Sequence, residues 1–240
     1  MAITILSSSY PGVAAETYNV TVPCDILDGV SRVLFVSAQS QGNNGQANIT
    51  RVELQQLGGT LVKALVPVLT VDADNILHCH YYALLDADMP AAGGYQIYVE
   101  AYQSNPGAFV TMASYVLFTE CSQTYTPLTA SNTNAGGTSI AQNITIPASG
   151  AILDNWAGEG GSSAVKTLMG NNTAYFESLQ AGTLKGVAGF YAAPAAGTYT
   201  FTWSGDFHNR NAMGIFFWAG STTPPTSDRS INPLLIGANW

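Results

Sequence analysis

The histidine pair His78 and His80 is the part of the sequence best suited to bind a metal ion. Both lie in an apolar run that is typical of a β-strand. Residues i and i+2 of a strand face the same side, so the two imidazoles could bind Zn²⁺ or another divalent ion together. A third ligand is needed, and Tyr81–Leu85, which follow directly, supply none. We therefore predict no resident metal or cofactor: the histidines are half-exposed strand residues with Cys79 in the core, and metal binding is the alternative.

Two short acidic segments resemble fragments of calcium-binding loops. Asp72–Asn75 and Asp86–Asp88 place carboxylates close together, as hard cations require. Neither segment has the glycine and the distal glutamate that complete an EF-hand loop. Because acidic residues also close turns without an ion, we predict that these are turn residues.

No group of residues has the spacing of a catalytic motif. Gly160–Ala164 resembles a nucleophile elbow but lacks its final glycine and the helix that should follow. The acidic residues have no spacing that selects a pair for glycoside hydrolysis, and no glycine-rich phosphate loop opens a helix. The sequence therefore predicts a protein that is not an enzyme.

Aromatic residues beside polar ones make the candidate glycan-binding site. An exposed aromatic ring can stack on the C–H face of a sugar while polar side chains bind its hydroxyls. One segment combines these residue types: Trp203, Asp206, Phe207, His208, Asn209 and Arg210. These residues would form the contact if the protein recognises glycans on a bacterial surface.

Charge and hydropathy exclude other classes of protein. Of the 240 residues, 47% are hydrophobic and 9% are charged, and the net charge is −8. Without a basic stripe the chain cannot neutralise a run of phosphates, which excludes nucleic-acid binding. No stretch of roughly 18 apolar residues is present, so we expect no membrane insertion. The three cysteines, Cys24, Cys79 and Cys121, have no paired spacing, and we expect buried thiols.

The elements that must position these residues are β-strands. Short β-branched and aromatic runs are separated by Gly, Pro, Asn and Ser clusters, which is typical of an all-β sandwich or barrel. Thr17–Val22 alternates and is expected to stop at Pro23, whereas Arg32–Ala38 predicts a more deeply buried strand. Further strands are predicted at 49–54, 60–66, 76–84, 95–102, 109–118, 140–146, 150–156, 164–169, 183–192, 198–203 and 213–218.

An internal repeat divides the chain. Asn19-Val-Thr-Val-Pro23 recurs as Asn143-Ile-Thr-Ile-Pro147, and Pro90-Ala-Ala-Gly-Gly-Tyr95 recurs as Pro194-Ala-Ala-Gly-Thr-Tyr199. The offset falls from 124 to 104 residues, so the first copy holds about twenty extra residues, which we place within Gln39–Asp74. In the second motif proline fixes φ, glycine permits positive φ, and tyrosine opens the next strand. The fold class is therefore all-β, with two tandem β-sandwich (jelly-roll-like) domains related by an internal repeat.

The domain boundary is predicted from composition. The tract Ser122–Gly137 is rich in Ser, Thr, Asn and Gly, which is typical of a linker. We place a first domain with an N-terminal arm at residues 1–126 and a second domain with a C-terminal tail at residues 127–240. The ends, Met1–Pro11 and Thr222–Trp240, are candidate arms that add a strand or an apolar anchor to a neighbouring copy.

The pattern of strands and turns resembles a known family. Ser31–Val36, the turns that begin at Pro90 and Pro194, and the strand pair of Trp203–Gly205 and Ala212–Phe216 resemble the tandem β-sandwich, jelly-roll-like structural proteins of tailed bacteriophages and bacterial surface proteins. The likeness covers most of residues 15–220 and includes no catalytic signature.

The resemblance implies a virion structural protein: a capsid decoration, fibre, or head or tail appendage protein that is assembled in the host cytoplasm. Its expected partners are further copies of itself and a major capsid or tail protein. A carbohydrate-binding module or adhesin that recognises host surface glycans is the alternative. The scarcity of charge is compatible with assembly, because surfaces with few ions can be joined without the cost of desolvating them.

Overall fold

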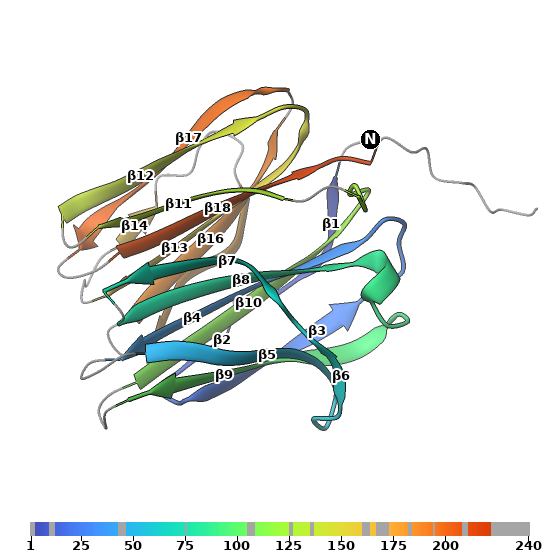
Figure 1. Cartoon of the computed structure of the whole chain (residues 1–240), viewed down its shortest axis with the longest axis horizontal. Helices are drawn as coiled ribbons and strands as arrows, with labels where there is room; N and C mark the ends of the chain where they lie inside the picture. Colours follow the sequence, from blue (N-terminus) through green and yellow to red (C-terminus); the bar gives the residue numbers. More distant parts are fainter. Residues whose placement is uncertain are drawn as a thin grey trace, which may run out of the picture.

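Four antiparallel sheets stack as four layers in the computed structural model of the chain (Figure 1). The structure describes residues 3–9, 13–42, 47–74, 76–104, 109–124, 127–134, 137–159, 164–166, 173–181, 184–193, 195–207 and 211–221. The prediction of an all-β fold is confirmed.

The first half of the chain supplies two of the layers. The first inner sheet contains β1 (Thr4–Ser8), β2 (Val13–Ala15), β4 (Val33–Gly42), β7 (Pro67–Ala73), β8 (Leu77–Leu85) and β10 (Phe109–Thr119). Its strand order is β1-β10-β4-β8-β7, and β2 pairs with β10. The first outer sheet contains β3 (Asn19–Ile26), β5 (Ala47–Gln56), β6 (Leu61–Ala64) and β9 (Gly93–Gln103), in the order β3-β9-β5-β6. A short 3-10 turn, η1 (Asp86–Asp88), follows β8.

The second half supplies the other two layers. The second inner sheet contains β11 (Leu128–Asn134), β13 (Gly150–Glu159), β15 (Thr173–Ala181), β16 (Leu184–Ala193) and β18 (Asn211–Ala219), in the order β11-β18-β13-β16-β15. The second outer sheet contains β12 (Gly137–Ile146), β14 (Ala164–Lys166) and β17 (Gly197–Phe207), in the order β12-β17-β14.

The two halves share their strand order. In the inner sheets β1, β10, β4, β8 and β7 correspond in sequence to β11, β18, β13, β16 and β15, and in the outer sheets β3, β9 and β5 correspond to β12, β17 and β14. The recurring turn motif is also closed in the same way, because the hydroxyl of Tyr95 donates to the carbonyl of Ala91 at 3.0 Å and that of Tyr199 to Ala195 at 2.9 Å. Both features support the internal repeat. The repeat and the domain boundary at residues 126 and 127 stay predictions.

A shared apolar core lies between the two inner sheets. Phe35 and Tyr81 of the first inner sheet contact Phe216 of the second, with ring centroids 4.9 Å and 4.7 Å apart. Every residue of β4 and of β10 is buried, because one face of these strands packs on the first outer sheet and the other on the second half. The prediction of a deeply buried strand at Arg32–Ala38 is therefore confirmed, and Figure 1 shows the inner sheets at the centre of the stack.

Two glycines of the second inner sheet let the inner sheets approach closely. A Cβ atom at Gly186 would lie 2.5 Å from the Gln39 side chain and from that of Met112. A Cβ atom at Gly214 would lie 2.6 Å from the ring of Tyr81. Since Tyr81 is fully buried and packs against the rings of both Phe35 and Phe216, it has little room to move aside.

Two sequence predictions about where strands run were wrong. Strand β3 does not stop at Pro23 but continues through it to Ile26. Because β3 is an edge strand that pairs only with β9, proline can stand there without breaking a ladder. The predicted linker Ser122–Gly137 contains β11, an edge strand whose exposed side chains are mostly polar. Within the predicted N-terminal arm Met1–Pro11, β1 pairs with β10 of its own chain, and the addition of a strand to a neighbouring copy stays a prediction.

Hydrogen bonds hold the start of the crossover between the halves in place. The Ser122 N–H donates to the carbonyl of Ala219 at 3.0 Å, and the Trp218 indole donates to the carbonyl of Ser122 at 2.9 Å. Gln123 donates to the carbonyl of Arg32 at 3.0 Å. These hydrogen bonds join the start of the supposed linker to both halves, so it is part of the packed body.

Replacing Gly214 by alanine should destabilise the protein, because the new methyl group would overlap the immobile Tyr81 ring. We expect the free energy of unfolding in urea to fall by about 1–3 kcal/mol. The matched control is Gly94→Ala in β9, where the nearest atom to the added Cβ is Leu57 Cδ1 at an ordinary 3.4 Å. The control should change stability by less than about 0.5 kcal/mol. Equal effects of the two substitutions would contradict the close approach.

Candidate functional sites and surfaces

The predicted metal pair lies on the face of β8 that turns toward the first outer sheet. His78 is cross-strand neighbour to Ser40 of β4 and to Asp72 of β7. His78 is buried, with 7% of its surface exposed, and His80 is partly buried. Cys79 points to the opposite face and into the core between the inner sheets, as predicted. The expectation that both histidines are half-exposed was therefore wrong for His78.

The two imidazoles have different surroundings. His78 Nε2 lies 3.7 Å from Asp72 Oδ1, and His80 Nδ1 lies 3.3 Å from the Tyr82 hydroxyl. The ring centroids of the two histidines are 6.2 Å apart. Burial, together with the nearby His78, lowers the pKa of His80 from 6.5 to about 4, so this imidazole is neutral at neutral pH.

No metal centre is assembled around this pair. Within the described ranges, no three His, Cys, Asp or Glu side chains are grouped so that they could hold a metal ion. The three cysteines are buried and free, as expected, and burial raises the pKa of each thiol to about 12.

The carboxylates of the second acidic segment are used in ion pairs. The Asp86 carboxylate binds the guanidinium of Arg32 at 2.6 Å, and the Asp86 backbone N–H donates to Gln123 Oε1 at 3.0 Å. Asp88 binds Lys63 Nζ at 2.8 Å. These two aspartates therefore fix η1 against neighbouring strands, which agrees with their prediction as turn residues. Asn75 of the first acidic segment lies outside the described residues.

Trp203 cannot serve as the predicted sugar platform. It is 2% exposed and lies in the core between the second inner and outer sheets, where its ring stacks on Trp156 with centroids 6.5 Å apart. The backbone of Asp206 and Phe207 is described as part of β17, but their side chains are not. His208, Asn209 and Arg210 lie outside the described residues. The central aromatic ring of the glycan-binding prediction is therefore buried and cannot contact a sugar.

The described side chains on the solvent face of the second outer sheet carry no charge, and together they are here called the threonine face. Its described side chains are Ser139, Ala141, Asn143 and Thr145 of β12, and Thr198, Thr200 and Thr202 of β17. They stand in cross-strand register, with Asn143 opposite Thr200 and Thr145 opposite Thr198. The two hydroxyls of the latter pair are 2.8 Å apart. All seven are uncharged, and all but the partly buried Thr202 are exposed.

The equivalent face of the first outer sheet has the opposite character. Arg51 Nε binds Glu100 Oε2 at 2.8 Å, and its guanidinium lies 5.0 Å from the centroid of the Tyr98 ring. Glu53 lies 3.5 Å from Arg51 and accepts a hydrogen bond from Gln55 at 2.7 Å. The polar groups of this face bind each other, whereas the described side chains of the threonine face carry no charge.

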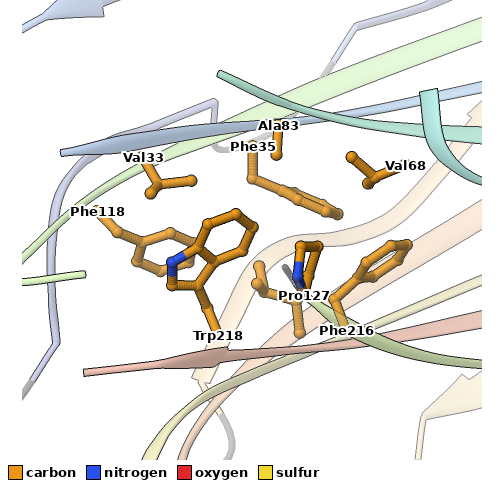
Figure 2. A pocket seen from close by; sticks show the side chains of 9 residues that line it. Val33, Phe35, Val68, Ala83, Phe118, Pro127, Phe216 and Trp218 are labelled. Atoms are coloured by element: carbon orange, nitrogen blue, oxygen red, sulfur yellow. The ribbon is translucent and has the colours of Figure 1, made fainter. Parts of the chain in front are cut away.

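An apolar crevice lies between the inner sheets, and Figure 2 shows its side chains pointing toward one another. It is narrow and has room for about one water molecule. Its lining is entirely apolar and comes from both halves: Val33, Phe35, Val68, Ala83, Phe118, Pro127, Leu153, Phe216 and Trp218. Such a site has no group that could orient a polar ligand.

Sequence reasoning missed both of these surfaces. The threonine face had a signal, because Thr198, Thr200 and Thr202 recur with the period of a strand. The same alternation places Phe201 and Trp203 on the inner side, so it could also have corrected the glycan prediction. The crevice had no local signal, since its lining residues are brought together only by the packing of the two inner sheets.

Comparison with known proteins gives a weak likeness to solved structures. No protein-family model matches the chain, and no curated protein matches it. Among solved structures, the chain is similar to "Crystal Structure of the STIV MCP", a viral major capsid protein, with 9% sequence identity and a TM-score of 0.34. The likeness covers 90% of this chain and 96% of that chain. In the described part of the protein, no helix has the length and apolar character needed to cross a bilayer.

Replacing His80 by glutamine should reduce the acid sensitivity of the fold. In the wild type the unfolded state binds a proton below pH 6.5, while folded His80 stays neutral to about pH 4. Stability is therefore lost as the pH falls through this window, by at most about 3 kcal/mol from this group. Urea unfolding at pH 7 and pH 4.5 should show a smaller loss for His80→Gln than for the wild type. Equal losses would contradict the assignment.

Proposed function

We propose that the protein is a virion structural protein, a capsid decoration or a head or tail appendage protein, that acts through protein–protein interfaces. The observation that carries the proposal is the threonine face, where seven uncharged side chains stand in register on one exposed sheet. A face of this kind can be covered by a partner without leaving a buried ion unpaired.

The chemistry of the face favours another protein as its partner. Threonine hydroxyls and the Asn143 amide both donate and accept hydrogen bonds, so they can be satisfied by polar side chains of a partner or by bridging water. The short side chains of alternating threonines give a level surface, which suits contact with a second sheet or a capsid surface. The ion pairs of the opposite outer face, around Arg51, would have to be desolvated in such a contact.

The rest of the described chain is consistent with a structural role. The histidine pair lacks a third metal ligand, the thiols are buried, and the aspartates of η1 are held in ion pairs. We place the protein in the virion, with the major capsid or a tail protein and further copies of itself as partners.

Replacing Thr200 by lysine should abolish assembly. Lysine at this position would bring an unpaired charge into the buried interface, whereas an exposed strand position tolerates the change in the free protein. We expect T200K to run as a monomer by size-exclusion chromatography with light scattering, with an unchanged melting temperature. It should also be absent from particles analysed by mass spectrometry, while the wild-type protein is present.

The matched control is Thr21→Lys, the same substitution at an exposed position on the outer face of β3. It should assemble like the wild type. If T21K and T200K behave alike, the threonine face is not the interface. If the wild-type protein is a monomer and is absent from particles, the virion role itself is wrong.

A further inference from the structure

We propose that the hairpin between β5 and β7 carries an apolar anchor, which inserts into an apolar hollow with a basic rim on a different virion protein. The anchor consists of Leu57 and Leu61 of this hairpin and of Leu27, which follows β3, and it is here called the leucine anchor. The proposal rests on the virion role proposed above. It concerns a second surface, because the first outer sheet and the threonine face lie at opposite ends of the stack of layers (Figure 1).

The hairpin is an addition to the fold that the two halves share. Twenty residues separate the starts of β5 and β7, whereas nine separate the starts of the corresponding strands β14 and β15. The extra residues include β6, and the described part of the second half has no strand in the same place. Since the second half keeps the same strand order without β6, this hairpin is not required to build the fold.

The hairpin exposes large apolar side chains. Three of the four most exposed large apolar residues in the described chain lie between β5 and β7: Val66 at 76%, Leu57 at 66% and Leu61 at 54%. Val62 and Leu65 of the same segment pack against the core of the first half, so the hairpin is held at its base. Apolar side chains that gather on the surface of a folded protein mark a contact with another molecule.

The turn of the hairpin holds its leucines in a fixed place. Gly58 and Gly59 have φ angles of +102° and +94°, which favour glycine, and the Gly59 N–H donates to the carbonyl of Gln56 at 3.0 Å. Leu57 Cδ1 lies 3.4 Å from the position of a Cβ atom at Gly94, so this side chain rests on β9. Figure 1 shows β6 at the end of the first outer sheet, away from the second half.

The neighbouring strands extend the apolar surface. Ile26, the last residue of β3, pairs with Gly93 of β9, and Leu27 follows it with 42% of its surface exposed. Residues 91–94, which lead into β9, are exposed alanines and glycines. Because the sheet order is β3-β9-β5-β6, Leu27 lies on one side of these small residues and the hairpin on the other. The three leucines therefore stand at the same end of the sheet.

The charges around the leucine anchor are acidic. The Asp25 carboxylate and Leu57 both lie within 4.0 Å of the Cβ position of Gly94, and Asp28 is exposed beside Leu27. Neither carboxylate forms an ion pair with a described residue. The single cationic residue of the hairpin, Lys63, is paired with an aspartate at 2.8 Å.

These charges indicate the chemistry of the partner. A surface that covers the leucines is complementary when it brings basic groups opposite the two carboxylates. An anionic lipid surface would instead be repelled by them, and a membrane attracts apolar segments that carry basic residues. We therefore assign the leucine anchor to a protein whose apolar hollow has a basic rim.

A second copy of the chain is a poor partner for the leucine anchor. The crevice between the inner sheets has room for about one water molecule, so a leucine side chain cannot enter it. Three leucines also bury much less than the roughly 800 Å² that each partner contributes to a stable dimer. The anchor is suited to a contact that adds to another one on the same particle, where a second attachment raises the overall affinity.

Replacing Leu57 and Leu61 together by alanine tests the leucine anchor. Purified full-length protein is added to virus particles assembled without it, and the bound fraction is measured after sedimentation. We expect L57A/L61A to bind about a hundredfold more weakly than the wild type, because both side chains would be buried in the complex. Its melting temperature should be unchanged, since both are exposed in the free protein. The matched control is Tyr102→Ala, which removes a 57% exposed ring at the opposite end of β9 and should bind like the wild type.

Reversing a charge tests the basic rim of the partner. Asp25→Lys would place like charges in contact, and we expect binding to the particles to weaken at least about tenfold at low salt. The matched control, Thr21→Lys, adds a positive charge on the same strand away from the anchor and should bind like the wild type. Particle binding of the wild type should also weaken as the NaCl concentration rises. Binding of D25K at wild-type strength would contradict the basic rim.

Three results would overturn the leucine anchor. The first is wild-type affinity of L57A/L61A for the particles. The second is sedimentation of the wild-type protein with vesicles of phosphatidylglycerol and phosphatidylcholine, which would assign the leucines to a membrane. The third is a dimer of the wild-type protein in the absence of particles that L57A/L61A does not form, which would assign them to a second copy.

Failure of the leucine anchor can be told apart from failure of the virion role. If T200K loses the particles and L57A/L61A keeps them, the threonine face is the interface and the anchor is wrong. If the wild-type protein does not bind the particles at all, both the virion role and the anchor are wrong.

Discussion

The apolar contact between the two inner sheets is the constraint on which the rest of the structure depends. It buries the second face of sheets that are already covered on their first face, so strands such as β4 and β10 have no side that could hold an ion. The central strands β4 and β10 thus have almost no solvent surface. This agrees with the low charge of the chain, 9% of the residues, although one carboxylate, Asp154 of the central strand β13, is buried at 2% exposure.

The outer sheets divide the remaining surface into two unlike faces. On the first outer sheet, Arg51 and its carboxylate partners satisfy each other within the chain. On the second, the hydroxyls of the threonine face are short, uncharged and level. One outer face therefore carries charged groups that pair within the chain, and the described side chains of the other are uncharged, although the strand order of the two halves is the same.

Sequence reasoning found the strands whose pattern is local and missed those set by position in a sheet. Arg32–Ala38 was recognised because it is apolar at nearly every position, which is what a strand buried on both faces requires. Pro23 was misread as a strand end, because nothing in the local sequence reveals that β3 is an edge strand. The same holds for β11, whose polar, exposed side chains resemble those of a linker.

The candidate sites were predictable only in part. The strand period correctly placed Cys79 in the core opposite His78 and His80. It did not show that β7 and β4 would bury His78, because that depends on cross-strand pairing. Trp203 was predicted from its polar neighbours in sequence, whereas the alternation that includes Phe201 already places it inward. For Trp203, the period of the strand predicts on which face the side chain lies, whereas its polar neighbours in sequence do not.

The shared core also has a consequence for synthesis on the ribosome. Once β10 has emerged, the first sandwich can close on its own outer sheet, but the opposite face of its inner sheet remains bare until β18 is made about a hundred residues later. At about 5–20 residues per second this interval lasts roughly 5–20 seconds. During it the nascent chain presents Phe35, Tyr81 and Phe118 to solvent, so this incomplete state is the one most exposed to aggregation and to capture by chaperones.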